Sequence, residues 1–475
     1  MFYHADFYRA GTSGVGSRGL CIVKNDATGK VFRSCLMKTA PGMDISTEDK
    51  ECKKARKTAL QLILANHPLE CLACIRNTRC ELQALVAKVN IREIPYISKP
   101  MNVEHDSSSI SIHINPNKCI KCGYCVVACK VLQQIEALEV GDMEHTTQIR
   151  AIGGLTLEET PCVKCGCTAH CPVAGTYEKD HIHGVWETLD DPEIHTVVQI
   201  APAVRVAFGE EFGLKAGTLV TGKIYAVLRC LGFDKIFDTN FGADITIMEE
   251  VPEFTHRFVN EPQKLPVITS CCPSWVDYCE KYYSNTIENL SSSKSSHQMF
   301  GAMVKSYYAE RENIDPAKVH VVSVMPCTSK KYEIGCHKDM FVNGYVDVDI
   351  VITTRELARM VRELGIDFLN LPEEEADQLM GEYSGTGPIF GVTGGVLESA
   401  LRTAYYYIFN EDLPDSAVEF QEARGLVKNK VVTINIKDRE VRVAVVHGIQ
   451  NVKAILNEVE DAKAKGEPLL YDLIK

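Results

Sequence analysis

The stretch that is most informative about the fold of this chain reads Cys119-Ile120-Lys121-Cys122-Gly123-Tyr124-Cys125-Val126-Val127-Ala128-Cys129. A second run of the same kind reads Cys162-Val163-Lys164-Cys165-Gly166-Cys167-Thr168-Ala169-His170-Cys171-Pro172. Cysteines two residues apart cannot easily bridge to each other, but their thiolates can converge on one metal centre. We therefore interpret both runs as metal ligands rather than as parts of a disulfide framework.

The spacing of both runs is typical of a two-cluster ferredoxin, in which the fourth cysteine of each run binds the cluster held by the other. The rule predicts two sets of [4Fe–4S] ligands: Cys119, Cys122, Cys125 and Cys171 for one cluster, and Cys162, Cys165, Cys167 and Cys129 for the other. Only Gly166 separates Cys165 from Cys167, so the second run is one residue short and the geometry of Cys167 stays open. A pair of zinc knuckles is the alternative.

A third ligand group lies upstream and reads His67-x-x-x-Cys71-x-x-Cys74-x-x-x-x-x-Cys80. One imidazole and three thiolates can hold a further [4Fe–4S] cluster, and a neutral His ligand should raise its reduction potential relative to four thiolates. The same side chains can form a Cys₃His zinc site. Beside ferredoxin-like runs we favour the cluster.

The bulk composition restricts the class of protein. The chain has 475 residues, which predicts two to four domains, and 20 cysteines, most of them clustered. Its net charge of −12 argues against nucleic acid as a partner. No apolar run approaches the roughly 18–20 residues of a membrane-spanning helix. We expect a protein of a reducing, anaerobic compartment, either cytoplasmic or hydrogenosomal.

The second half of the chain alternates predicted strands and helices, which is typical of an α/β domain. Predicted strands at 196–200, 265–268 and 321–324 each end in a loop that contains Pro or Cys, and a further strand at 441–446 precedes a helix at 452–465. Open α/β sheets bind ligands at the carboxyl ends of their strands, so these loops are expected to face one site. In the first half, Ser46 is predicted to cap a helix that runs towards Leu64.

The N-terminal residues resemble known iron–sulfur modules. Tyr3-His4-Ala5-Asp6, Arg18-Gly19-Leu20-Cys21, Cys35 and Ala65-Asn66-His67-Pro68-Leu69-Glu70-Cys71 are similar to modules shared by large iron-only hydrogenases and the large iron–sulfur subunit of NADH dehydrogenases. The resemblance implies a [2Fe–2S] centre, which needs four cysteines. This chain offers Cys21 and Cys35, with Arg18 at one expected ligand position and no cysteine in residues 1–20. We therefore expect this centre to be empty or defective; two buried free thiols are the alternative.

Two long motifs in the second half extend the resemblance to the catalytic domain of iron-only hydrogenases. They are Thr269-Ser270-Cys271-Cys272-Pro273-Ser274-Trp275 and Met325-Pro326-Cys327-Thr328-Ser329-Lys330-Lys331-Tyr332-Glu333. The resemblance covers nearly the whole chain. It implies a six-iron site, in which a [4Fe–4S] cubane is joined to a two-iron unit that carries CO and cyanide.

The same resemblance implies roles for individual residues. Cys272 and Cys327 would bind the cubane, and Lys330 would donate a hydrogen bond to a cyanide ligand. Cys271 would pass protons. Ser291, Glu253 and Glu250 match the family's proton route to solvent. Taken alone, these side chains have local alternatives: a packed thiol for Cys271, solvated carboxylates for the two Glu residues, a helix N-cap for Ser291 and a surface ammonium for Lys330. Four further cysteines match no motif and are expected to be structural: Cys52, Cys230, Cys279 and Cys336.

The family's third ligand loop, which supplies the last two cysteine ligands, has no counterpart before Lys475. Because the chain also begins within the [2Fe–2S] region, a fragment truncated at both ends is expected, with degeneration as the alternative. We predict a partial [2Fe–2S] domain (1–40), a His-ligated [4Fe–4S] domain (41–98), an α+β two-[4Fe–4S] ferredoxin-like domain (99–185) and an α/β catalytic domain that lacks its last ligand loop (186–475).

Together these features predict a ferredoxin-linked hydrogenase. Electrons from ferredoxin would pass through three accessory [4Fe–4S] clusters to the six-iron site, where protons and dihydrogen interconvert. A non-catalytic electron relay, a hydrogenase-like protein of sensing or cluster assembly, and an inactive fragment are the alternatives. An NADH-oxidising subunit is a further candidate partner.

Overall fold

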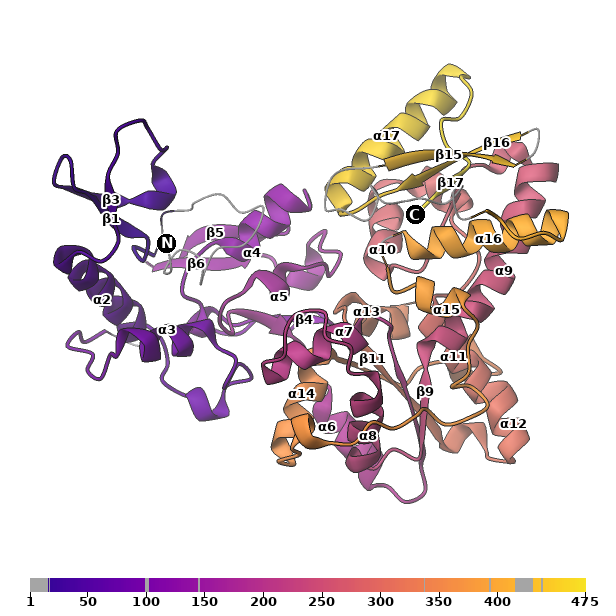
Figure 1. Cartoon of the computed structure of the whole chain (residues 1–475), viewed down its shortest axis with the longest axis horizontal. Coiled ribbons are helices and arrows are strands. Elements are labelled where there is room, and N and C mark those ends of the chain that lie inside the picture. The colour runs from indigo at the N-terminus through magenta and orange to yellow at the C-terminus, as the bar shows by residue number, and fades with distance from the viewer. Residues whose placement is uncertain are drawn as a thin grey trace. The chain divides into compact units, whose positions relative to one another are not determined.

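The computed structural model describes residue 16 and residues 18–98, 102–143, 146–336, 338–392, 394–414, 430–436 and 439–475. The segment Tyr3-His4-Ala5-Asp6 lies outside the described residues. The chain divides into two compact units, Met1–Lys179 and Asp180–Lys475 (Figure 1). The four predicted domain limits stay predictions.

Unit 1 begins with a small antiparallel sheet in the order β2-β1-β3, followed by helices α2 and α3. Their bounds are β1 Ile22–Asn25, β2 Lys30–Arg33, β3 Ile45–Ser46, α2 Lys50–Ala65 and α3 Glu81–Val89. The predicted cap at Ser46 is wrong, because Ser46 is held in β3 opposite Lys24. Asp49 caps the helix instead, and its carboxylate accepts a 2.8 Å hydrogen bond from the Glu51 amide.

The rest of unit 1 consists of short elements around the two cysteine runs. They are β4 Ile112–Ile114, α4 Tyr124–Val127, β5 Leu138–Met143, β6 Thr146–Ala151, α5 Cys167–His170 and β7 Thr176–Glu178. Strands β4 and β7 pair antiparallel, as do β5 and β6. One apolar core joins α2 and α3 to this part, because Leu60, Leu85, Ile120 and Val173 are all buried in it. This core fixes the first cysteine run against the His67 region.

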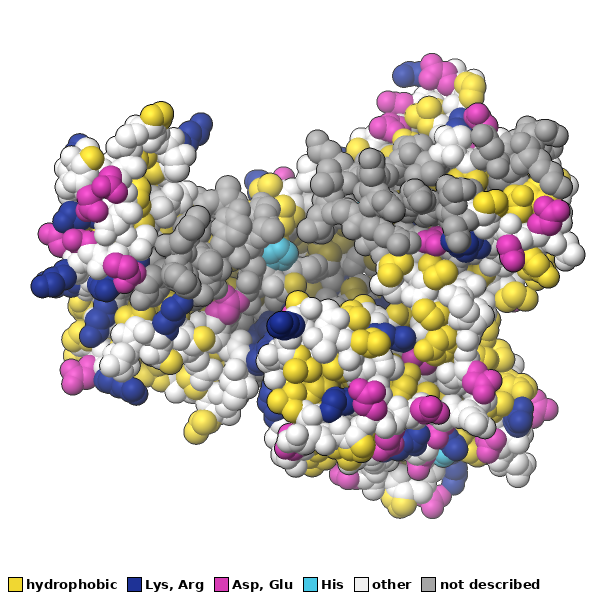
Figure 2. All heavy atoms as spheres, in the orientation of Figure 1, with side chains coloured by type: hydrophobic (Ala, Val, Ile, Leu, Met, Phe, Trp, Pro, Cys, Tyr) yellow, Lys and Arg dark blue, Asp and Glu magenta, His cyan; other side chains and the backbone are white. Residues whose placement is uncertain are grey.

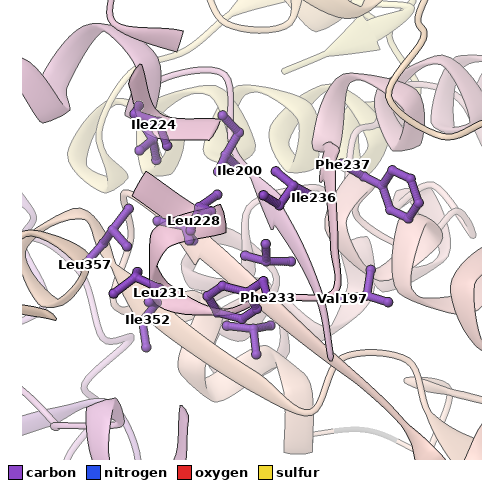
Figure 3. Packing of buried hydrophobic residues seen from close by; sticks show 14 of the residues in the cluster. Val197, Ile200, Ile224, Leu228, Leu231, Phe233, Ile236, Phe237, Ile352 and Leu357 are labelled. Atoms are coloured by element: carbon purple, nitrogen blue, oxygen red, sulfur yellow. The ribbon is translucent and has the colours of Figure 1, made fainter. Parts of the chain in front are cut away.

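Unit 2 is built on a parallel sheet in the order β14-β11-β8-β9. Its strands are β8 His195–Ile200, β9 Lys235–Asp238, β11 Val319–Met325 and β14 Ile350–Thr353. Helices α6 Ile182–Asp190, α8 Thr221–Leu231 and α14 Thr354–Glu363 contribute to the same core. Figure 3 shows Ile352 of β14 beside Leu357 of α14 and Leu231 of α8, and Val197 and Ile236 of the strands belong to the same core. Strands buried on both faces explain the nearly continuous apolar runs of the sequence.

A second sheet in unit 2 has the order β10-β17-β16-β15. Its strands are β10 Val267–Ile268, β15 Lys430–Ile436, β16 Arg439–Val445 and β17 Leu473–Ile474, and helix α17 Ile449–Lys465 joins β16 to β17. Strands β10, β17 and β16 are parallel, and β15 is antiparallel to β16. The predicted strand at 265–268 is shorter than expected, because Pro266 has no amide hydrogen for a ladder.

The remaining elements of unit 2 connect the two sheets. The helices are α7 Val204–Ala207, α9 Thr239–Asn260, α10 Pro273–Tyr282, α11 Ser296–Met303, α12 Ala309–Glu312, α13 Ser329–Cys336, α15 Thr386–Ile389 and α16 Gly395–Phe409, and the hairpin strands are β12 Phe341–Val342 and β13 Tyr345–Val346. The predicted α/β class of the larger domain and its small iron–sulfur domains are confirmed. Among the described residues no helix is long and apolar enough to cross a membrane.

Candidate iron–sulfur and catalytic sites

The two cysteine runs of unit 1 adopt the same local geometry. Lys121 and Lys164, two residues after the first cysteine of each run, have positive φ values of 55° and 57°. Their amides donate 3.3 Å hydrogen bonds to the Sγ atoms of Cys119 and Cys162. Amide hydrogen bonds to a cluster's sulfur ligands stabilise the reduced, more negative cluster, so this repeated turn suits thiolate ligands.

The first predicted ligand set comes together in space. Burial raises the pKa of Cys119 to about 12 and that of Cys122 to about 11. Burial also raises the pKa of Cys125 well above its usual value, and the charges of Cys119, Cys122 and Cys171 raise it further. Such thiols are stable as thiolates only beside positive charge, which an iron–sulfur cluster supplies.

The second set is also assembled, including the residue whose spacing is irregular. Cys167 begins α5 and is buried, which raises its thiol pKa well above the usual value, and the charges of Cys162, Cys165 and Cys129 add to this effect. The short spacing is therefore accommodated by the turn at Gly166 that starts the helix. Among the described residues, no three His, Cys, Asp or Glu side chains converge as closely as the ligands of one metal ion. A cubane does not require this, because each thiolate binds a different iron atom.

The His67 group also fits a metal centre. The His67 Nδ1 atom is buried without a hydrogen-bond partner among the described residues. Burial and the charge of Lys118 lower the pKa of His67 to about 4, so the ring is neutral at pH 7, as a metal ligand must be. Burial raises the pKa of Cys80, and the charges of Cys74 and Cys71 contribute to the rise. A neutral imidazole with an unpartnered nitrogen is what the predicted ligand set requires of His67.

The [2Fe–2S] centre does not fit the residues present. Cys21 and Cys35 are both free, as the alternative of two buried free thiols expects, but they are half-buried and not buried. Their Sγ atoms lie 3.1 Å apart. Arg18 hydrogen-bonds the Tyr124 hydroxyl, and its guanidinium carbon lies 4.3 Å from the centre of the Tyr124 ring. Two thiols and a cation do not make the four-thiolate ligand set of such a centre.

In unit 2, the loops after β10 and β11 meet as predicted. Burial raises the pKa of the Cys272 thiol to about 12, and the nearby charges of Cys327 and Cys271 add to the rise. Cys272 as a whole residue is nevertheless exposed to solvent. The loop after β8 lies beside the end of β11, where the Ala201 amide donates a 3.0 Å hydrogen bond to the Val324 carbonyl.

Lys330 links the loops that follow β10 and β11. Its Nζ atom donates a 2.9 Å hydrogen bond to the Cys271 carbonyl and lies 2.8 Å from the Glu333 carboxylate. Its side chain is 13% exposed, which excludes a solvated surface lysine. On the other side, Glu333 contacts the fully buried His297. Burial alone would raise the pKa of Glu333, but the charges of Lys330 and His297 lower it to about 2.

The predicted proton-route residues lie around the end of α9. The Ser291 hydroxyl donates a 2.9 Å hydrogen bond to Glu253, which also forms a 2.6 Å ion pair with Arg257. Ser291 is not a helix cap, because its amide bonds the Ile268 carbonyl of β10 and the N-cap of α11 is Ser295. Burial raises the pKa of Glu250 to about 7, while the charge of Lys475 and the Ser291 hydroxyl oppose the shift. Both Glu residues are therefore shielded from bulk water.

A cavity of about 400 Å³ reaches this region from the surface of unit 2. Ser291, Arg257, Ser270 and Glu333 are among the residues that line it.

Sequence reasoning missed Arg257 and His297. Arg257 had a usable signal, since it lies four residues after Glu253 on one helix, whereas His297 had none. Of the four unassigned cysteines, which were expected to be structural, Cys52 and Cys279 are buried, Cys336 lines the cavity, and Cys230 is exposed.

Comparison with known proteins assigns most of the chain to described families. The model for the iron-only hydrogenase large subunit, C-terminal domain, matches residues 194–470. The NADH-ubiquinone oxidoreductase-G iron–sulfur binding region matches residues 56–95, and a 4Fe-4S binding domain matches residues 111–135.

Individual relatives cover nearly the whole chain. The NADP-reducing hydrogenase subunit HndD of Solidesulfovibrio fructosivorans is 42% identical over 92% of this chain and 75% of its own length. Iron hydrogenase 1 of Clostridium pasteurianum is 42% identical over 91% of this chain and 75% of its own length. The structure of a variant of apo [FeFe]-hydrogenase HydA1 from Chlamydomonas reinhardtii is 37% identical, covers 62% of this chain and 81% of its own, and superposes with a TM-score of 0.54.

Proposed function

Because this chain belongs to the family of iron-only hydrogenase large subunits, we propose that it interconverts protons and dihydrogen, with electrons exchanged with a ferredoxin through accessory iron–sulfur clusters. The observation that carries this proposal is the contact between the loop of Cys271 and Cys272 and the loop of Cys327. The Lys330 ammonium, three residues after Cys327, donates a hydrogen bond to the Cys271 carbonyl. An electron relay has no use for this arrangement.

The chain's own residues have separate tasks in the proposed reaction. Cys272 and Cys327 would supply two of the four cysteine ligands of the six-iron cofactor, which would provide the site of electron transfer to protons. Lys330 is held between the Cys271 carbonyl and Glu333, so its ammonium would be available as a charged donor to a cyanide ligand. Cys271 would exchange protons with the cofactor.

Proton supply to Cys271 is assigned to the groups at the end of α9. A carboxyl group with a pKa of about 7, as Glu250 has, both holds and releases a proton at neutral pH. The Ser291 hydroxyl donates to Glu253, and two of the hydrogen-bond partners of Glu253, Ser291 and Arg257, line the cavity. Groups that alternately donate and accept at these distances suit a relay.

A basic cleft in unit 1 supports an acidic electron carrier as the partner. Unit 1 contains 22 Lys and Arg against 18 Asp and Glu, whereas unit 2 contains 29 against 45. The cleft is lined by the cations Arg18, Arg33, Lys54 and Lys121, by the single carboxylate Glu51, and by Cys119. Figure 2 shows Lys and Arg side chains spread over the visible face of unit 1. A small acidic ferredoxin docked there would lie next to a predicted cluster ligand.

A nicotinamide-linked partner subunit is the second candidate electron source. It is favoured by the match of residues 56–95 to the NADH-ubiquinone oxidoreductase-G region and by the name of the relative HndD, which is NADP-reducing. We assign the protein to a reducing, anaerobic compartment, the cytoplasm or a hydrogenosome.

The test is hydrogen evolution by the anaerobically matured protein completed with the family's third ligand loop, because Cys272 and Cys327 supply only two of the four cysteine ligands of the cubane. Reduced ferredoxin and reduced methyl viologen serve separately as electron donors, and the 475-residue chain alone should evolve no hydrogen with either. We expect both donors to support turnover. The Cys271→Ala variant should lose turnover with both donors and keep the iron content of the wild type. A fully active variant would reject the proton-transfer role. Turnover with methyl viologen but not with ferredoxin would favour the nicotinamide-linked partner.

A further inference from the structure

The sheet at the start of unit 1 brings two cysteines together outside every predicted [4Fe–4S] ligand set. Cys21 directly precedes β1, and Cys35 follows β2 by two residues. The hairpin between them is closed by the antiparallel ladder and by a 2.9 Å hydrogen bond from the Ser34 amide to the Cys21 carbonyl. The two Sγ atoms lie 3.1 Å apart. A regular hairpin thus holds the two thiols side by side.

The group that the family would place here is excluded by the ligand set. A [2Fe–2S] cluster of the plant type needs four thiolates, and residues 1–20 contain no cysteine. Arg18 stands at one expected ligand position, and its guanidinium is directed to Tyr124 of the first cysteine run. Among the described residues, no further His, Cys, Asp or Glu joins the pair as a metal ligand.

We infer that Cys21 and Cys35 form a redox-active dithiol, which closes to an intramolecular disulfide in place of the [2Fe–2S] cluster. An S–S bond is about 2.05 Å long, so the two sulfur atoms need to approach by only about 1 Å. Both side chains are half-buried, so a small disulfide reagent reaches them. Cys52, the other unassigned cysteine of unit 1, is fully buried and has no such neighbour among the described residues.

The chemistry is thiol–disulfide exchange with a low-molecular-weight disulfide such as oxidised glutathione. The thiolate of one cysteine attacks a glutathione sulfur, forming a mixed disulfide and releasing one glutathione thiolate. The second cysteine attacks the protein sulfur of that mixed disulfide and releases the second glutathione. The cysteine pair loses two electrons, the glutathione disulfide gains them, and the two protons leave with the two glutathione thiols. In a reducing compartment such a bond is transient, so the dithiol form dominates until the thiol–disulfide balance shifts.

The experiment uses the full chain with its clusters reconstituted anaerobically, equilibrated in glutathione buffers of increasing oxidised fraction. The reaction is stopped with acid, free thiols are blocked with N-ethylmaleimide, and the protein is digested with trypsin. Cleavage after Arg18, Lys24, Arg33 and Lys38 separates the two cysteines into peptides 19–24 and 34–38. We expect the cross-linked peptide pair to replace the two maleimide-labelled peptides as oxidised glutathione increases, with the iron content unchanged.

Matched variants identify the bond. Cys21→Ser and Cys35→Ser should each abolish the cross-linked pair and leave the remaining cysteine as a mixed disulfide with glutathione. The exposed Cys230 of unit 2 is the internal control, because it should form only the mixed disulfide in every variant. Circular dichroism establishes that both serine variants are folded.

Two results would overturn the inference. One is a pair of separate mixed disulfides at Cys21 and Cys35 without a cross-link. The other is a [2Fe–2S] electron paramagnetic resonance signal that both serine variants lose, together with about two iron atoms per chain. Neither result depends on hydrogen evolution, so the inference and the proposed function fail or stand separately.

Discussion

The Ser291 hydroxyl donates a 2.9 Å hydrogen bond to the Glu253 carboxylate, although 38 residues separate the two in sequence. Glu253 lies on α9, and Ser291 is fixed by the 2.7 Å hydrogen bond from its amide to the Ile268 carbonyl of β10. The loop that contains Cys271 leaves the same strand. One short strand therefore positions both Cys271, the proposed proton donor, and the hydroxyl of Ser291.

This relationship predicts that Ser291→Ala slows turnover, because the alanine can neither accept nor donate a proton. We expect hydrogen evolution from reduced methyl viologen to fall by roughly a hundredfold, the lower range for a lost acid–base group. Ser291→Thr keeps a hydroxyl at the same position and is the matched control, which should retain most of the activity. Equal losses in both variants would show that Ser291 acts through packing alone.

The raised pKa of the Glu250 carboxyl predicts that the stability of the protein depends on pH. The carboxyl has an ordinary pKa of 4.5 and a folded-state pKa of about 7, raised by burial. Between these pH values the folded protein keeps a proton that the unfolded chain has released, so the free energy of unfolding falls as pH rises through this window. The loss is roughly 3 kcal/mol once pH exceeds 7. Glu250→Gln removes it, so the Tm of the variant minus that of the wild type should increase from pH 5 to pH 8. A difference that is constant with pH would contradict the shifted pKa.

The buried pair of Lys330 and Glu333 predicts a coupling between two variants. Glu333→Gln leaves the Lys330 ammonium without its 2.8 Å counter-ion, and removing one partner of a buried pair costs about 3–5 kcal/mol. The double variant Lys330→Met/Glu333→Gln should regain part of this stability, because neither charge is then left unpaired. Thermal unfolding of Lys330→Met, Glu333→Gln, the double variant and the wild type measures the coupling. Additive losses would mean that the two side chains do not interact.

If His67 binds a cluster, replacing it by Cys should change the reduction potential of that cluster without loss of iron. His67→Cys replaces a neutral ligand by an anionic one, so the cluster should be retained and its midpoint potential lowered. His67→Ala should instead lose about four iron atoms per chain. Redox titration followed by electron paramagnetic resonance, with iron analysis, distinguishes the two. The exposed His183, replaced by Ala, is the control and should change neither quantity. An unchanged iron content in His67→Ala would remove His67 from the ligand set.

The basic cleft predicts a rate effect specific to an acidic partner. Lys54→Glu or Lys121→Glu should slow reduction of the reconstituted clusters by reduced ferredoxin by roughly tenfold at low ionic strength, and the effect should shrink with added salt. The exposed Lys38, which is outside the cleft lining, gives a control of equal charge change in Lys38→Glu. Stopped-flow absorbance follows the reaction, with dithionite as the small reductant that should be insensitive to all three changes. Equal slowing by Lys38→Glu would assign the effect to net charge and not to the cleft.

The sequence predicted well what depends on local spacing. The two cysteine runs, the strands now seen as β8, β11 and β16, and helix α17 follow from short-range patterns, and the structure contains each of them. The prediction at Ser46 was wrong for a long-range reason, because pairing with Lys24 of β1 keeps Ser46 extended and moves the cap to Asp49. Strand pairing can override a local capping signal, since the ladder satisfies the same backbone groups.

The sequence by itself determined which atoms are offered as ligands, because spacings of two and three residues fix which sulfurs share a turn. Only the tertiary structure decided which groups from distant segments meet: Cys272 near Cys327, Ser291 on Glu253, His297 behind Glu333, and Cys21 beside Cys35. These contacts depend on the order of the strands in the two sheets and on the packing of α9 against α11. No periodicity along the chain encodes such contacts, because their residues are brought together by burial of the whole core.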